Sequence, residues 1–313
     1  MADAALAGVL VADFSRVLAG PLATMTLGDL GAEVIKIERP EVGDETRAWA
    51  PPLAPDGSAT YYLSVNRNKR SIALDLSTDE GRRLARKLAL RADVLVENFA
   101  PGVMERFGLG YEAVAAENPG VIYASVTGFG RGAGAGLPGY DFLVQAVGGL
   151  MAITGHPDGE PTKAGVAVVD VLAGLHLTIG VLAALHARAR TGRGQRVEVS
   201  LLGSVLAGLV NQASAQLNAG VEPARMGNAH PSIVPYQTLR TADRPIAVAV
   251  GNDRQFARLA AIVGLAPDPH YATNPSRVRH RELLVAQLEE RLAVRPSAYW
   301  VAALQEAGVP CGP

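Results

Sequence analysis

The pattern of apolar and polar positions predicts a chain of alternating strands and helices. Short β-branched runs in the first 130 residues are separated by stretches with the apolar spacing of helices. The expected strands cover residues 9–14, 33–38, 71–76, 93–97, 121–126, 195–200 and 246–250. The expected helices cover residues 21–30, 77–91, 141–154, 171–190, 201–218, 253–263, 276–294 and 298–307. This alternation predicts an α/β fold with a mainly parallel sheet covered by helices.

The composition of the sequence changes near residue 221. A proline-rich connection contains Pro223, Pro231 and Pro235, and one expected strand and three expected helices follow it. We therefore predict a large domain over residues 1–220 and a smaller α/β domain over residues 221–313. The last residues, 309–313, have the composition of a loop.

One charged residue lies inside the most apolar part of the chain. Asp170 is the only fully charged side chain from residue 166 to residue 187, and we expect a strand to end and a helix to begin beside it. Such a carboxylate is either a helix N-cap or a group kept for chemistry. A helix N-terminus would lower its pKa and keep it ionised. The stretch has membrane length, but Asp170 and its many small residues favour a core element.

Composition narrows the class of protein. The 29 basic and 30 acidic residues give a net charge of -1, which argues against a nucleic-acid-binding protein. The apolar fraction of 49% is typical of a soluble globular protein. A single cysteine, Cys311, allows no intrachain disulfide and indicates a cytoplasmic protein. The histidines show no metal-ligand spacing, so we expect no metal.

Two local patterns suggest a binding site for a small molecule. Arg16 and Arg39 follow the first two expected strands directly, where open α/β sheets bind ligands, and either is a plausible phosphate ligand. Glycines recur at every second position from Gly128 to Gly134, after another expected strand. Because this spacing runs into Pro138, it does not open a helix as a dinucleotide-binding fingerprint does. The glycine-rich segment is therefore either an active-site loop or a plain connector.

Seven segments together resemble a known family. They are residues 11–21, 30–40, 66–71, 93–99, 125–130, 139–141 and 191–195, and they follow one another along almost the whole chain. In these segments the chain resembles the class III CoA-transferases, the family of formyl-CoA transferase, carnitine-related CoA-transferases and α-methylacyl-CoA racemase.

The resemblance implies a fold, a reaction and a site. It implies a Rossmann-like large domain, a small α/β domain, an interlocked homodimer, and a further C-terminal segment beyond Pro313 that returns to the large domain. It implies that Asp170 is a nucleophile that carries CoA as an aspartyl thioester between an acyl-CoA donor and a carboxylic acid, without a metal. The CoA site that it implies consists of Arg16, Val17, Ala19, Arg39, Leu74, Asn98, Phe99, Arg106 and Tyr140.

At several positions the chain departs from the family pattern, and these departures bear on alternative activities and substrates. The racemase has a histidine where this chain has Tyr140, and a phenol with a pKa near 10 is a poor base, so racemisation is disfavoured. Besides a CoA-transferase and a racemase, a third interpretation is an inactive, shortened relative that only binds CoA. Arg16 and Leu18 replace a histidine and a glutamine of formyl-CoA transferase, and Pro138 replaces its lysine. Formate and oxalate are therefore not expected as substrates, whereas Arg16 would suit the second carboxylate of a dicarboxylic acid such as succinate.

Overall fold

The computed structural model describes residues 4–313, which divide into two compact units. The first unit ends at residue 223 and the main part of the second unit covers residues 224–313, close to the expected boundary at 221. Residues 152–162, expected in the large domain, belong to the second unit instead. The backbone N–H of Gly227 donates to the Gly155 carbonyl at 2.9 Å, and Arg225 Nε donates to the His156 carbonyl at 3.3 Å. These hydrogen bonds attach the segment 152–162 to the second unit.

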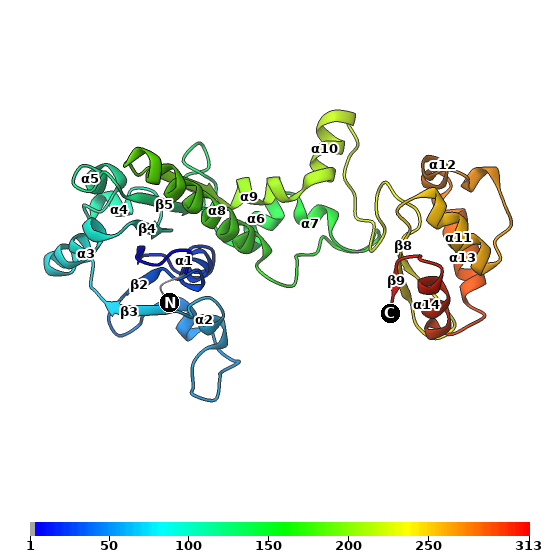
Figure 1. Ribbon diagram of the computed structural model, residues 1–313, viewed down its shortest axis with the longest axis horizontal. Helices are drawn as coiled ribbons and strands as arrows, with labels where there is room; N and C mark the ends of the chain where they lie inside the picture. Colours follow the sequence, from blue (N-terminus) through cyan, green and yellow to red (C-terminus); the bar gives the residue numbers. More distant parts are fainter. Residues whose placement is uncertain (1–3) are drawn as a thin grey trace. The chain divides into compact units, whose positions relative to one another are not determined.

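The first unit is built on a parallel six-stranded sheet, as the sequence predicts. Its strands lie in the order β3-β2-β1-β4-β5-β6, and every neighbouring pair is parallel. Figure 1 labels β2, β3, β4 and β5 of this sheet. They are β1 (Leu10–Asp13), β2 (Glu33–Glu38), β3 (Lys69–Ala73), β4 (Val94–Glu97), β5 (Ile122–Thr127) and β6 (Arg196–Ser200). Strand β3 begins two residues earlier than expected, because Lys69 to Ala73 pair with residues 34–38 of β2.

Helices cover both faces of this sheet. On one face lie α1 (Ala19–Asp29), α8 (Val168–Thr191) and α9 (Leu201–Gly208), and on the other lie α3 (Asp79–Arg91), α4 (Val103–Arg106) and α5 (Tyr111–Ala115). Successive strand residues serve opposite faces, so Val11 belongs to the first core and Ala12 to the second. The inner strands are therefore mostly apolar on both faces, as Val94, Leu95 and Val96 of β4 show.

The remaining elements of the first unit differ in part from expectation. They are the 3-10 turn η1 (Glu45–Ala48), α2 (Thr60–Ser64), α6 (Asp141–Val147), α7 (Leu150–Ile153) and α10 (Val210–Ala219). The expected helix over 141–154 is broken because Gly149 has a left-handed φ of 85°. The helix expected over 201–218 is likewise two helices, α9 and α10. No strand precedes Asp170, where residues 161–167 have no regular structure.

Helix α8 is long and apolar enough to cross a membrane by length and composition. In the structure one side of it is buried in the core of the first unit, through Val169, Ala173, Leu177, Val181 and Ala184. It packs closely on α1, because a Cβ at Gly174 would lie 2.7 Å from the carbonyl oxygen of Ala19. The helix therefore forms part of a core, as the sequence predicts.

The second unit carries a three-stranded antiparallel sheet and its own core. Its elements are β7 (Tyr236–Leu239), β8 (Ile246–Ala249), α11 (Asp253–Val263), η2 (Pro269–Tyr271), α12 (Asn274–Arg279), α13 (Arg281–Leu292), α14 (Ser297–Glu306) and β9 (Cys311–Gly312). The loop expected over 309–313 is wrong, because Cys311 pairs with Val248 in the sheet. The helix expected over 276–294 is two helices, since His280 leaves the helical conformation at φ -110° and ψ 26°.

Candidate functional site

A cavity of about 690 Å³ lies in the first unit at the carboxyl ends of β1, β4 and β5. The loops after these strands and the first turn of α8 form its wall, a position typical of ligand sites in open parallel sheets. It brings together seven of the residues expected at the site: Arg16, Val17, Ala19, Asn98, Phe99, Tyr140 and Asp170.

A second cavity, of about 220 Å³, takes up two more of the expected residues. Arg39 and Leu74 line it, and Arg16 and Phe99 line both cavities, so the two are neighbours. Arg106 lines neither, because it is the exposed last residue of α4. The expectation that Arg106 contributes to the CoA site stays a prediction.

The glycine-rich segment after β5 is part of the cavity wall. Gly128, Gly130 and residues 135–139 line the larger cavity, which favours the active-site loop over the plain connector. A Cβ at Gly128 would lie 2.3 Å from the Cα of Gly139, so the two ends of the loop can meet only as glycines. No helix opens before Asp141, in keeping with the rejection of a dinucleotide fingerprint.

Some residues that line the larger cavity were not anticipated from the sequence, and they include Glu45, Trp49 and Asp141. Trp49 packs edge-to-face on Tyr61 with ring centroids 5.1 Å apart. Glu45 and Trp49 come from the loop after β2. This loop is rich in Pro, Gly and Asp and has no helical or strand periodicity, so the sequence did not indicate where its side chains would lie. For Asp141, the sequence offered only its place after Gly139 and Tyr140.

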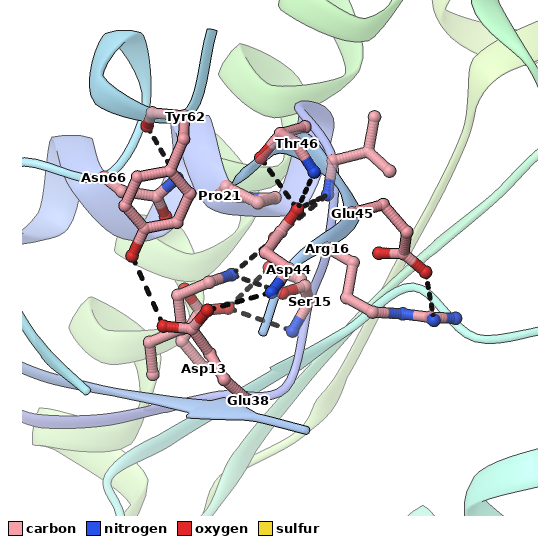
Figure 2. A network of polar contacts seen from close by, with 12 residues as sticks. Asp13, Ser15, Arg16, Pro21, Glu38, Asp44, Glu45, Thr46, Tyr62 and Asn66 are labelled. Atoms are coloured by element: carbon pink, nitrogen blue, oxygen red, sulfur yellow. Dashed lines mark hydrogen bonds and ion pairs between the residues drawn. The ribbon is translucent and has the colours of Figure 1, made fainter. Parts of the chain in front are cut away.

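A buried ion pair holds the loop after β1, residues 15–18, in place. Lys36 Nζ lies 2.9 Å from Asp44 Oδ2 and donates to the Ser15 carbonyl at 2.8 Å, and both side chains are almost fully buried. Asp44 also accepts hydrogen bonds from Thr46, from its backbone N–H at 3.0 Å and its hydroxyl at 2.8 Å (Figure 2). The backbone N–H of Val17 points to both oxygens of the same carboxylate, at 3.4 and 3.3 Å. One buried anion thus fixes two loops at the cavity.

Val17 itself has an uncommon backbone conformation. Its φ is 69°, which a β-branched residue rarely adopts. Such a conformation costs free energy and persists where the surroundings enforce it, often at functional sites. Here the bonds to Asp44 enforce it, and the result is a cavity wall formed by Arg16 to Ala19.

A second buried pair joins β1 to β3. Lys69 Nζ contacts Asp13 Oδ2 at 3.0 Å and donates to the Pro21 carbonyl and to Asn66 Oδ1, each at 2.9 Å. Asp13 is also bonded to Ser15 and Thr24. Burial alone would raise the pKa of Asp13, but the charges of Lys69 and Lys36 hold it down at about 2. Every hydrogen of the Lys69 ammonium is used, so this polar cluster is a satisfied, rigid base for the loop.

Asn98 connects the ends of β1 and β4. Its Oδ1 accepts from the backbone N–H of Arg16 at 2.9 Å, and its Nδ2 donates to the Arg16 carbonyl at 2.7 Å. The Arg16 guanidinium lies over the ring of Phe99, 4.7 Å from its centroid. Arg16 Nη1 also pairs with Glu45 Oε1 at 2.6 Å (Figure 2). The cation is therefore held at the boundary of the two cavities.

Asp170 is the third residue of α8 and not its cap. The N-cap residue is Ala167, which has no side chain to accept a hydrogen bond. Asp141, at the start of α6, takes this role from another element. Its Oδ1 accepts from the backbone N–H groups of Val169 at 2.8 Å and Asp170 at 3.3 Å. The N-cap interpretation of Asp170 is therefore wrong, because a neighbouring carboxylate occupies the helix end.

Asp141 is itself fixed by a buried side chain. Gln145 Nε2 donates to Asp141 Oδ2 at 2.6 Å, and Gln145 Oε1 accepts from the backbone N–H of Ala164 at 2.8 Å. Gln145 is fully buried. The amide thus fastens Asp141 and the segment that leads into α8 to each other, which sets the position of Asp170.

The protonation of Asp170 is opposite to the sequence-based expectation. Burial raises its pKa, and the negative charge of Asp141 raises it further, to about 7. The stabilising effect of the helix N-terminus was expected to lower the pKa, but Asp141 already uses the N–H groups there. Burial and the charges of Asp170 and Asp141 also raise the pKa of Tyr61 to about 12, which keeps this neighbouring phenol neutral.

The geometry defines what the site can do. A half-buried carboxyl group with a pKa of about 7 is present as a nucleophilic carboxylate in a large fraction of molecules at neutral pH. Its cavity is wide enough for an extended small molecule and continues toward the basic side chains Arg16 and Arg39. Within residues 4–313, no three His, Cys, Asp or Glu side chains are grouped to hold a metal ion.

Comparison with known proteins adds a family to this geometry. The sequence model of CoA-transferase family III matches residues 6–313. The chain is 49% identical over 285 residues to a succinate–glutarate CoA-transferase of Agrobacterium fabrum, covering 88% of this chain and 71% of that protein. It is 42% identical over 311 residues to an acetyl-CoA:oxalate CoA-transferase of Acetobacter aceti, covering 98% of this chain and 79% of that protein.

A solved structure agrees with these sequence matches. The crystal structure of a CAIB/BAIF family protein from Brucella suis superposes with a TM-score of 0.86 at 47% identity. The superposition covers 99% of this chain and 83% of that one. The chain therefore belongs to CoA-transferase family III, a family of enzymes.

Proposed function

We propose that this enzyme moves CoA from an acyl-CoA to a carboxylic acid through a covalent thioester on Asp170. The observation that carries the proposal is the position of Asp170, a half-buried carboxyl group with a raised pKa on the wall of the larger cavity. A nucleophile of this kind divides one difficult exchange into easier steps. The names of the related CoA-transferases support the overall reaction.

The proposed steps balance as two exchanges at the same carboxylate. Asp170 attacks the thioester carbonyl of the donor, the C–S bond breaks, and CoA thiolate leaves an Asp170–acyl anhydride. The thiolate then attacks the Asp170 carbonyl and releases the donor as a free carboxylate. The acceptor carboxylate attacks the resulting aspartyl-CoA thioester, and the thiolate released attacks the acceptor side of the new anhydride. Asp170 is regenerated and the acceptor leaves as its CoA ester.

The surroundings of Asp170 suit these steps. Proximity of thioester and carboxylate in one cavity removes the entropic cost of bringing them together. The backbone N–H groups of residues 168–171 already donate to Asp141 or to neighbouring carbonyls, so they are not counted as oxyanion donors. The neutral Tyr61 phenol is the proposed donor to the oxyanion that forms at the attacked carbonyl. Asp141, which the sequence had not marked as part of the site, is proposed to hold α8 in place during the exchange.

The CoA moiety is proposed to span the two cavities. The sheet order 3-2-1-4-5-6 is shared with nucleotide-binding doubly wound folds, and their ligands lie at these strand ends. Leu74 offers an apolar wall in the smaller cavity and Arg39 a phosphate ligand. The pantetheine arm would pass Phe99, which lines both cavities, and bring the sulfur to Asp170.

Short dicarboxylic acids are the proposed substrate class. The relative from Agrobacterium is named for succinate and glutarate, and Arg16 on the cavity wall offers a cation for a second carboxylate. Oxalate, for which the relative from Acetobacter is named, is the shorter alternative. Arg16 and Leu18 argue for the longer acids.

A homodimer is the proposed assembly, in a reducing cytoplasm. Large apolar side chains are exposed on α8, α9 and α10: Leu175, Ile179, Leu206, Val210 and Leu217. Exposed apolar surface of this kind typically marks an interface, and a second copy of the chain is the proposed partner. Light scattering coupled to gel filtration tests this, and a monomer at micromolar concentration would contradict it.

Covalent trapping tests the central proposal. The enzyme is incubated with a panel of acyl-CoAs, including succinyl-CoA, and the thioester is converted with hydroxylamine or borohydride before peptide mass spectrometry. We expect the modification on the peptide that contains Asp170, and none in Asp170→Asn. Asp158→Asn, a change at an exposed acid, is the matched control and should label like the wild type. Full transfer activity in Asp170→Ala would rule out the covalent route, and deuterium uptake at the acyl α-carbon would point to a racemase.

A further inference from the structure

Glu45 and Arg16 form an ion pair that is left incomplete inside the cavity wall. Arg16 Nη1 meets Glu45 Oε1 at 2.6 Å, yet Arg16 Nε and Glu45 Oε2 are both buried and have no hydrogen-bond partner within the described structure. Buried polar atoms without partners are uncommon and costly. A bidentate guanidinium–carboxylate contact would satisfy both atoms, but this pair makes only one bond.

The two residues stand at the point where a substrate would arrive. Both line the larger cavity together with Asp170. The Arg16 guanidinium is fixed from the other side by the Phe99 ring, at 4.7 Å, and its backbone is clamped by Asn98. The cation is therefore held in position while its contact with Glu45 is the adjustable one, since both side chains remain about one-third exposed.

Glu45 has a second partner that would remain if it left Arg16. Arg39 Nη2 lies 3.4 Å from the same oxygen, Glu45 Oε1. Breaking the Arg16 contact thus does not strand Glu45 as a lone buried charge, which would be expensive. An exchange of partners costs about as much as breaking one part-exposed ion pair, a small amount.

We propose that Glu45 is a specificity-determining residue that occupies Arg16 until the distal carboxylate of a dicarboxylic acid replaces it. The inference rests on the proposed function and deepens it by naming how the acceptor is selected. The distal carboxylate forms the charge-assisted bonds that Glu45 leaves incomplete, while the other carboxylate of the same acid lies at Asp170. A monocarboxylic acid of equal length has nothing to offer Arg16 and leaves the pair closed.

The charges facing this pair are few. Arg39 approaches from the loop after β2, and the other titratable groups on the cavity wall are Asp141, Asp170 and Tyr140. Without an acid in place, Glu45 balances Arg16 in a cavity that already holds two carboxyl groups. With a dicarboxylate in place, the positive charge of Arg16 serves the ligand, and Arg39 remains as the counter-ion of Glu45.

The test compares glutarate with butyrate as acceptors and uses one donor, succinyl-CoA, throughout. The measured quantity is the ratio of kcat/KM for glutarate to kcat/KM for butyrate, with KM and kcat resolved separately. Arg16→Gln should lower this ratio by about tenfold or more, because a charge-assisted bond to the distal carboxylate is lost. Glu45→Gln should raise the ratio by about threefold to fivefold, through a lower KM for glutarate, because the competing charge is gone.

Controls separate this effect from general damage. Glu41→Gln removes an exposed acid from the same loop and should leave the ratio unchanged. Glu45→Ala repeats the Glu45 test with a side chain that cannot bond to Arg16 at all, and thermal melting shows that each variant is folded. An equal loss for both acceptors in Arg16→Gln, or an unchanged or lowered ratio in Glu45→Gln and Glu45→Ala, overturns the proposal. The ratio is defined for any route of CoA transfer, so a failure to trap Asp170 would reject the covalent intermediate without deciding this result.

Discussion

The backbone N–H of Asp170 donates to Oδ1 of Asp141 at 3.3 Å, so one acid caps the helix that carries the other. Burial raises the pKa of Asp170, and the negative charge of Asp141 raises it further. The arrangement makes the start of α8 rigid and at the same time denies Asp170 the N–H groups that would keep it ionised. A residue outside the helix thus sets the position of the proposed nucleophile and adds to the rise in pKa that burial causes.

The first prediction concerns the pH dependence of covalent labelling. Because the pKa of Asp170 is raised to about 7, the carboxylate fraction rises through neutral pH, and single-turnover trapping with succinyl-CoA should rise with a midpoint near pH 7. Asp141→Asn keeps an oxygen for the helix N–H groups but removes the charge, so the midpoint should move to lower pH. Glu80→Gln, on the distant helix α3, should leave it in place. An unmoved midpoint in Asp141→Asn would show that the charge of Asp141 does not act on the nucleophile.

The second prediction is that the half-buried Asp170 carboxylate lowers the free energy of unfolding. A carboxyl group whose pKa is raised in the folded state binds its proton more tightly there than in the unfolded chain. Its destabilising effect is therefore absent below the ordinary pKa of 3.8, grows as the pH rises, and is complete above about 7. Asp170→Asn should raise the free energy of unfolding by about 2 to 4 kcal/mol at pH 8 and by clearly less at pH 5.

Urea denaturation at the two pH values measures this difference. Asp158→Asn, at an exposed position, is the matched control and should change little at either pH. A gain for Asp170→Asn that is equal at pH 5 and pH 8 would mean that the benefit comes from packing and not from the lost charge.

The sequence predicted the sheet and its helices because these depend on local pattern, whereas the residues around Asp170 were implied by the resemblance to a known family. Strands such as β4 and β5 are mostly apolar, and the residues that the resemblance implied, among them Arg16, Asn98 and Asp170, line one cavity. What it missed depends on contacts between distant segments. The cap on α8 comes from Asp141, 29 residues earlier, and no local pattern identifies that partner. The direction of the Asp170 pKa was wrong for the same reason.

The third prediction concerns the close packing of α1 and α8. A Cβ at Gly174, one turn after Asp170, would lie 2.7 Å from the Ala19 carbonyl, and the backbone cannot yield as a side chain can. Gly174→Ala should cost about 1 to 3 kcal/mol of stability and weaken CoA transfer, because α8 must shift with its nucleophile. The measurements are urea denaturation and kcat. Gly208→Ala is the matched control, since its new Cβ would meet only the end of the Leu172 side chain, at 3.0 Å. Equal effects of the two changes would contradict the packing argument.

The fourth prediction concerns the ion pair beneath the first loop. Lys36→Met leaves the Asp44 carboxylate buried without its cation, and a broken buried pair typically costs about 3 to 5 kcal/mol. The double variant Lys36→Met/Asp44→Asn should recover part of this loss, because the amide removes the charge and still accepts from Val17 and Thr46. Urea denaturation measures both, and KM for acyl-CoA should follow the same order, since Val17 lines the cavity. Arg70→Met breaks the exposed pair with Glu33 and should change stability little. If the double variant is no more stable than Lys36→Met, the cost lies in lost packing of the lysine chain, and the charge pairing is not what holds the loop.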